Sequence, residues 1–278
     1  GASDRASVTY TLSRPDGSYQ TSVSPLTHEQ LPMISLPQSG EYFLFVDPYY
    51  GATVHARVLL TAGNGGGPVV DEDPADVTTT VGGQATFATF EVDEVDQRLG
   101  IGLSDLLLSS GSYASLYVYR PSGGIVASTT CYASYPGCEL NLRSPEAGTY
   151  GLVVLPQSHD QTMAYTLTLS NDLYRTVPRE TPITFNLARR GQNGRLLIAA
   201  RAGETLGLQI SGQTSVPAGN YVNYQLYMPD GTWLASRTTA DSDTVHMPTL
   251  PVSGDYLVFV DPHYGAAMSA QLLLTTGE

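Results

Sequence analysis

Residues 41–52 read EYFLFVDPYYGA, and residues 255–266 repeat the pattern as DYLVFVDPHYGA. Aligned without a gap at a constant offset of 214, residues 9–64 and 223–278 are identical at 24 of 56 positions. A weaker copy lies midway, where AGTYGLVVLP at 147–156 matches SGDYLVFVDP in the last copy. The period of about 107 residues is that of one β-sandwich domain rather than that of a short solenoid repeat.

The copies predict three units of unequal length. The third unit, residues 177–278, has a front half that reads ITFNLARRGQNGRLLIAARAGETLGLQISG at 183–212, and the second unit, residues 78–172, has a version of it. The first unit, residues 1–64, begins directly in the back half with SVTYTLSRPDG. We therefore expect two complete sandwiches preceded by a partial one, with a Gly-rich, acidic linker at 65–77. The join between the second and third units is shorter, so we expect these two to be held more rigidly together.

Local patterns favour strands. GRLLIAAR and TLGLQIS alternate apolar residues with polar or small ones, which is typical of strands with one buried face. YFLFV and YLVFV are apolar on both faces, as expected of a central strand covered on both sides. Pro-Asp-Gly at 15–17 and at 229–231 has the residue types of a hairpin turn. The tyrosine after Ser-Gly-Glu and Ser-Gly-Asp predicts a tyrosine corner, whose hydroxyl bonds to the backbone just upstream. The fold class is all-β.

Charge and hydropathy exclude two classes of partner. The formal net charge is −13 and no basic cluster interrupts the chain, so nucleic acid and anionic bilayers would be repelled. No apolar run reaches the length of about 18 residues that a membrane span needs, so we expect no membrane insertion.

The two cysteines lie in CYASYPGC, at Cys131 and Cys138. Their short spacing around Pro136 and Gly137 fits a disulfide at the end of a hairpin. A metal pair is the alternative, but zinc sites need a second such pair or nearby histidines. The disulfide indicates an oxidising compartment.

Two segments of the second unit, LYVYRPSGGIVAS at 116–128 and AGTYGLVVLPQSHDQTMAYTLTLS at 147–170, resemble the bacterial pre-peptidase C-terminal domain and similar tandem repeats. The resemblance implies a jelly-roll-like antiparallel sandwich in a large secreted or cell-surface protein of a bacterium, where it accompanies an enzyme or toxin without being catalytic. Some members bind Ca²⁺ near the linker that enters the sandwich, and some bind protein or polysaccharide substrates. The acidic candidates for Ca²⁺ are Asp71, Glu72, Asp73 and Asp76, which do not match the family position by position.

Asp-Pro-x-Tyr-Gly has two interpretations. As a turn, the Asp47 carboxylate accepts the backbone N–H two residues on, Pro48 fixes φ, Gly51 takes a conformation that other residues avoid, and Tyr50 packs over the corner. As a binding loop, its aromatic rings stack on a sugar. The ligand-binding candidates are then Asp47, Tyr49, Tyr50, Asp261, His263 and Tyr264.

No catalytic residues emerge. None of the five histidines lies in HExxH, and no GxSxG or phosphate-binding loop is present. The sequence predicts a non-catalytic tandem sandwich module that acts as a spacer, an adhesive or a ligand-binding appendage. The alternative is a calcium-dependent module that binds the carbohydrate or protein substrate of a secreted enzyme. We also expect self-association through the partial first unit, because its open edges and its apolar strand at 42–46 need cover.

Overall fold

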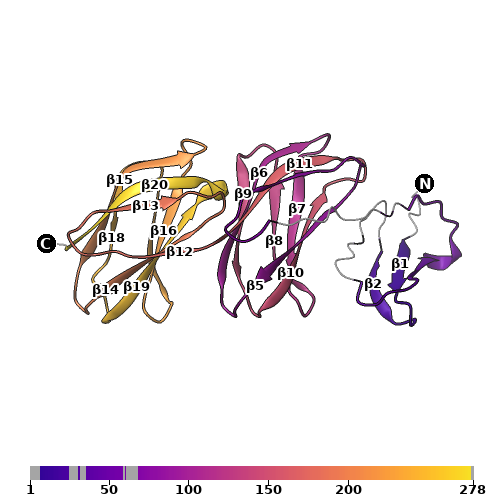
Figure 1. Cartoon of the computed structure of the whole chain (residues 1–278), viewed down its shortest axis with the longest axis horizontal. Coiled ribbons are helices and arrows are strands. Elements are labelled where there is room, and N and C mark those ends of the chain that lie inside the picture. The colour runs from indigo at the N-terminus through magenta and orange to yellow at the C-terminus, as the bar shows by residue number, and fades with distance from the viewer. Residues whose placement is uncertain (1–6, 25–30, 32–35, 59, 61–67, 277–278) are drawn as a thin grey trace.

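The computed structural model describes residues 7–24, 31, 36–58, 60 and 68–276 (Figure 1). Within these residues the protein is all-β, with 20 strands and two one-turn 3₁₀ helices. The strands form five sheets, which gather into three groups along the chain. No helix in the described ranges is long and apolar enough to cross a membrane.

The second unit is a complete two-sheet sandwich. Its strands are β4 (Ala75–Thr78), β5 (Thr86–Val92), β6 (Arg98–Leu108), β7 (Tyr113–Tyr119), β8 (Ile125–Tyr132), β9 (Gly137–Arg143), β10 (Gly148–Pro156) and β11 (Met163–Asn171). One sheet has the order β5-β10-β7-β8 and the other β4-β11-β6-β9, with antiparallel pairing throughout. This order is that of a jelly roll, and the two inner faces enclose one apolar core.

The third unit repeats this order and adds a strand. Its elements are β12 (Leu173–Thr176), β13 (Ile183–Leu187), β14 (Gly194–Ala200), β15 (Leu206–Val216), β16 (Val222–Tyr227), β17 (Trp233–Thr239), β18 (Asp243–His246), β19 (Gly254–Pro262), η2 (His263–Gly265) and β20 (Ala267–Thr276). The sheets are β12-β14-β19-β16-β17 and β13-β20-β15-β18, around a second core. The added strand β12 lies before the predicted start of this unit at residue 177, and it runs parallel to β14 at the edge of an otherwise antiparallel sheet. Here the short join leads the chain onto the sheet beside β14.

The first unit has one described sheet, of order β2-β1-β3. Its elements are β1 (Val8–Ser13), β2 (Tyr19–Val23), β3 (Phe43–Pro48) and η1 (Tyr49–Gly51). The offset of 214 carries β1 onto β16 and the end of β3 onto the end of β19. β19 is a central strand whose inward Val258 and Val260 are fully buried, whereas every residue of β3 before Pro48 is exposed.

The tyrosine corner predicted for the first and third units is confirmed there, and the second unit has one as well. The hydroxyl of Tyr150 donates to the carbonyl of Glu146 at 2.8 Å, and Tyr256 donates to Val252 at 2.8 Å. In the first unit Tyr42 donates to Gln38 at 2.9 Å. The glycine before each corner contacts the proline of the Pro-x-Gly turn, and the distances from an added Cβ on Gly40, Gly148 and Gly254 to Pro15, Pro121 and Pro229 are 2.8, 3.1 and 2.7 Å. The two short motifs of the repeat therefore form one packed unit.

The stretch expected as a linker, 65–77, is partly structured. Its end belongs to β4, which begins at Ala75 and pairs with β11. Upstream, Val70 packs against the core of the second unit, and the amide of Asp71 donates to the carbonyl of Leu169. The prediction is wrong for 75–77, because Ala75 and Val77 are half-buried on one face of β4, while Asp71, Glu72 and Asp73 are exposed. The Gly-rich residues before 68 lie outside the described part of the chain.

Candidate functional site

The Asp-Pro-x-Tyr-Gly corner has the same conformation in the first and third units. Tyr50 has φ 56° and ψ 27°, and Tyr264 has φ 57° and ψ 25°, so both tyrosines have a left-handed backbone conformation. Such a conformation is uncommon for a residue other than glycine and is typical of functional corners.

The predicted Asx turn is not the hydrogen-bonding pattern of this corner. The amide two residues after each aspartate donates to a backbone carbonyl instead: Tyr49 to Ser7 at 3.0 Å and His263 to Tyr221 at 2.9 Å. A backbone partner from the neighbouring strand therefore replaces the side chain, which leaves the aspartate free for other contacts.

In the third unit the corner docks on the second unit. Element η2 packs against β6 and β9, and the ring of Tyr264 stacks on Tyr135 with 4.8 Å between centroids. Gly265 is buried at this contact. A Cβ on Gly265 would lie 3.1 Å from the Gly191 nitrogen. The repeated motif is thus an interdomain contact at this position.

Glycines line the receiving surface on the second unit. A Cβ added to Gly100 of β6 would lie 1.9 Å from the carbonyl oxygen of Gly191, and one added to Gly102 would lie 2.6 Å from the backbone of Arg190. Gly191 itself has φ 75°, and its own added Cβ would lie 2.4 Å from the Gly102 nitrogen. Backbone meets backbone across the junction, which only residues without a side chain permit.

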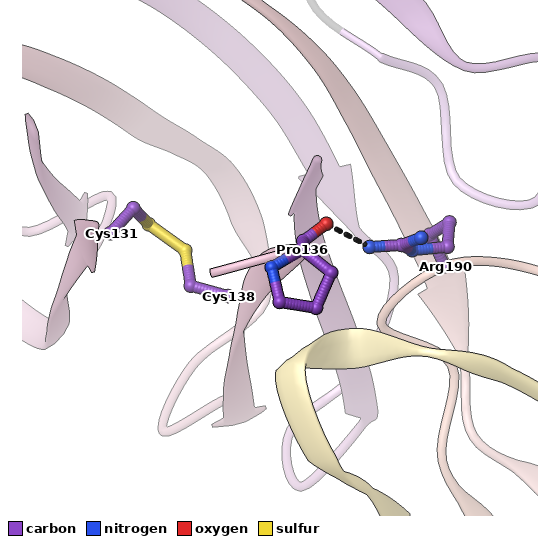
Figure 2. Close-up of a disulfide and its surroundings, with 4 residues drawn as sticks. All are labelled: Cys131, Pro136, Cys138 and Arg190. Carbon is purple, nitrogen blue, oxygen red and sulfur yellow. Dashed lines mark hydrogen bonds between the residues drawn. A yellow bond between two sulfur atoms is a disulfide. The ribbon is translucent and has the colours of Figure 1, made fainter. Parts of the chain in front are cut away.

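The predicted disulfide is present and shapes the same surface. Cys131 on β8 is bonded to Cys138 on β9, which closes the loop that presents Tyr135 and Pro136. Figure 2 shows the Pro136 carbonyl oxygen pointing to the Arg190 guanidinium, whose Nη2 donates to it at 2.6 Å. The disulfide therefore supports the loop that receives the third unit.

A polar network closes the junction beside the glycines. Arg195 Nε lies 2.6 Å from Asp172 Oδ2, with side-chain exposures of 13% and 2%. Asn193 Nδ2 donates to Asp172 Oδ1 at 3.1 Å and to Asn141 Oδ1 at 2.7 Å, and Asn141 Nδ2 donates to Asp261 Oδ2 at 3.4 Å. Removal of one partner of such a pair would leave an uncompensated buried charge.

Two carboxyl groups near the junction, those of Glu139 and Asp261, have raised pKa values. Burial, together with the nearby charge of Asp261, raises the pKa of Glu139 to about 7, although the Gly265 amide and Arg190 act in the opposite direction. Burial also raises the pKa of Asp261, while Asn141 and the charge of His263 lower it and Asp172 raises it. Asp261 Oδ1 is buried without a hydrogen-bond partner. The junction therefore contains titratable groups that resist ionisation.

The structure divides the predicted ligand-binding residues into two sets. Asp261, His263 and Tyr264 lie at the junction, where Tyr264 contacts the second unit. In the first unit Tyr49 is 48% exposed and Tyr50 is fully exposed, so Tyr50 does not pack over its own corner as expected.

The four acidic candidates for Ca²⁺ are not brought together. Asp71 accepts from the amide and side chain of Asn171, and Asp76 accepts from the Thr166 hydroxyl. The carbonyl, not the carboxylate, of Glu72 accepts from Arg189. Across the described ranges no three His, Cys, Asp or Glu side chains are grouped so that they could hold a metal ion.

The junction residues Gly100, Gly102, Arg190 and Gly191 were not among the residues predicted to form a site. The signal was present in a comparison of the units: the third unit has Gln209 at the position that Gly102 holds in the second. A glycine at one of two equivalent strand positions indicates a close backbone approach.

No family model and no curated protein sequence matches the chain. Solved structures that overlap with it include the pre-peptidase C-terminal domain of a collagenase from Bacillus anthracis, at 15% identity and a TM-score of 0.31, covering 40% of this chain and 99% of that one. The human MASP-1/3 CUB1-EGF-CUB2 domains overlap at 9% identity and a TM-score of 0.24, covering 73% and 99%. The tandem CBM22 domains of Paenibacillus barcinonensis Xyn10C overlap at 9% identity and a TM-score of 0.22, covering 68% and 82%. At these scores we base no functional argument on the overlaps.

Proposed function

We propose that the chain is a non-catalytic tandem β-sandwich module whose second and third units form one rigid spacer within a larger secreted or surface protein of a bacterium. The observation that carries the proposal is the junction: glycine backbones in contact, a corner from one unit docked on the other, and a buried ion pair beside them. The disulfide supports an oxidising location. Membership of the pre-peptidase C-terminal family remains a prediction from the resemblance.

The rigidity can be measured directly. Spin labels are attached to cysteines that replace Ser128 in the second unit and Ser236 in the third. A rigid spacer then gives a narrow distance distribution by pulsed electron paramagnetic resonance. A broad distribution at neutral pH would contradict a spacer role. Incubation with a panel of polysaccharides and proteins is expected to show no turnover, and cleavage of any of them would favour a hydrolase.

A second function is favoured by the exposed corner of the first unit. Tyr49 and Tyr50 present two uncovered rings 6.2 Å apart between centroids, which is a surface that stacks on sugars. The corresponding proposal is a calcium-dependent module that binds the polysaccharide or protein substrate of an attached enzyme. A glycan array with and without EDTA separates the two proposals, because only the binding module gives signals that EDTA removes and that Tyr50→Ala weakens.

A further inference from the structure

Strand β3 of the first unit has one paired edge. It pairs antiparallel with β1, with Tyr10 opposite Val46 and Leu12 opposite Leu44. On its other side the described part of the first unit contains no strand, because the sheet order is β2-β1-β3. The unpaired N–H and C=O groups of such an edge bind other strands readily.

The complete sandwiches show which strand occupies this position. The order β14-β19-β16-β17 in the third unit corresponds, among the described residues of the first unit, to β3-β1-β2 with no strand in the place of β14. In the third unit this place holds β14, whose Leu196 lies opposite Val258. In the second unit β5 fills the same place beside β10. Both neighbours come from the front half of the repeat.

The side chains of β3 lack the contacts that β14 gives to β19. The Arg195 guanidinium carbon lies 4.8 Å from the ring centroid of Phe259, which is directly opposite it in the register. The counterpart of Phe259 is Phe45, which is 63% exposed. Within the described residues, neither a strand nor a cation–π partner of Phe45 lies at this edge.

We propose that the free edge of β3 binds an extended strand of the repeat's front half, with the alternating pattern of GRLLIAAR at 194–201. The strand pairs antiparallel in the register of β14 and β19, and its arginine lies over Phe45. Backbone hydrogen bonds give the affinity, and the alternate side chains give the specificity.

A second copy of this chain is a poorer occupant. Its own β5 and β14 are each paired inside a sandwich, so they are not free to add to another edge. Pairing of β3 with β3 from another molecule would bring apolar side chains together but no cation to Phe45. The occupant is therefore a front-half segment that is not engaged in its own sandwich.

The test uses the full chain and a fluorescent peptide of residues 193–202. Saturable binding by anisotropy is expected, with slower amide exchange at 43–48 by mass spectrometry. The same peptide with Ile198→Pro is the control and should not bind, because proline removes a ladder donor. Phe45→Ala is expected to raise Kd about fivefold through loss of the cation–π contact. Tyr19→Ala, which removes an exposed ring at the far edge of the same sheet, should leave Kd unchanged.

Three outcomes would overturn the proposal. The first is no saturable binding, and the second is binding that leaves exchange at 43–48 unchanged. The third is a dimer by light scattering with these amides already protected, which would place a second copy on the edge. Exchange of the β1 amides in Phe45→Ala shows whether the sheet still forms, and Arg195→Ala in the peptide gives an independent variant that leaves the protein intact. None of these results depends on whether the module is a spacer.

Discussion

At the scale of single residues, this protein uses glycine where two domains meet. The added-Cβ distance of 1.9 Å from Gly100 to the Gly191 oxygen is shorter than any real contact, so the backbones must separate if a side chain is present. On the third unit the equivalent strand position is Gly207, where the nearest atom is the Thr275 hydroxyl at 3.1 Å. The same residue type is therefore essential for docking at one position and nearly free to change at the other.

This contrast predicts different outcomes for two matched variants. Gly100→Ala is expected to open the junction at a cost of about 1–3 kcal/mol, the range for overpacking a close contact. Gly207→Ala should cost less than about 1 kcal/mol, because a hydroxyl can move aside. Urea unfolding of both variants, combined with small-angle scattering, measures the difference. Equal effects of the two substitutions would show that the junction is looser than described.

Glu139 predicts the pH dependence of the junction. Its pKa is about 7 in the folded protein against an ordinary value of 4.5, so the folded state binds more protons between these two values. The free energy of unfolding therefore falls as pH rises from about 4.5 to 7 and is lowest above that range, with a total decrease on the order of 3 kcal/mol. Glu139→Gln should flatten this dependence and stabilise the protein at pH 8. Denaturation curves from pH 5 to 8 check the sign, and a wild-type stability that rises with pH would contradict it.

At the scale of elements, one corner has two different environments. In the third unit η2 is packed against β6 and β9, whereas in the first unit η1 has no buried residue. The conformation is the same in both, so the corner is set by its own sequence and its neighbouring strand. What differs is the surface that it meets.

Tyr264→Ala and Tyr50→Ala form the corresponding matched pair. Loss of the stacked ring at Tyr264 is expected to destabilise the junction by about 0.5–1.5 kcal/mol beyond the area lost. Tyr50→Ala removes a fully exposed ring and should leave the stability of the second and third units unchanged. Thermal unfolding followed by tyrosine fluorescence distinguishes them. A larger loss in Tyr50→Ala would show that the first-unit corner is also docked.

The disulfide loop is the element that receives the corner. Reduction of Cys131–Cys138 is expected to lower the free energy of unfolding by about 2–3 kcal/mol, the loop-closure value for a short ring. Reduction should also broaden the distribution of distances between the second and third units. The reason is that Pro136, in the disulfide loop, accepts the hydrogen bond from Arg190 of the third unit. Scanning calorimetry with and without reductant measures the first effect. An unchanged midpoint would mean that the loop is held without the bond.

At the scale of the whole molecule, the second and third units share one network. Asp172 is the last residue of the second unit. Its side chain is 2% exposed and forms an ion pair with Arg195 of the third unit. Such a pair, when one partner is removed, leaves an uncompensated buried charge. The two sandwiches are therefore expected to unfold together.

A single calorimetric transition for both sandwiches is the corresponding prediction. Asp172→Asn should split this transition into two, or lower the free energy of unfolding by about 3–5 kcal/mol, because Arg195 loses its partner. Arg143→Ala is the control, because its pair with Asp96 is more than half exposed on both sides and should contribute less than about 1 kcal/mol. Two transitions in the unmodified protein would show that the junction does not couple the units.

Much of the fold follows from the sequence alone. The repeat at offset 214, the alternation in GRLLIAAR and the Pro-x-Gly turns predict strands and sandwiches because strand periodicity and turn chemistry are local properties. The tyrosine corners and the Cys131–Cys138 bond were predicted for the same reason: both join residues close together in the chain.

The junction was decided by tertiary structure. Gly102 on β6 and Arg190 before β14 are far apart in the sequence, and nothing in either local pattern shows that they meet. The stacking of Tyr264 on Tyr135 and the raised pKa of Glu139 depend on the contact between the two units. Local sequence set the shape of each unit, while packing between units determined which of its residues are buried, charged or free to bind. This division reflects the physics, since strand and turn preferences act over a few residues and docking requires two folded surfaces.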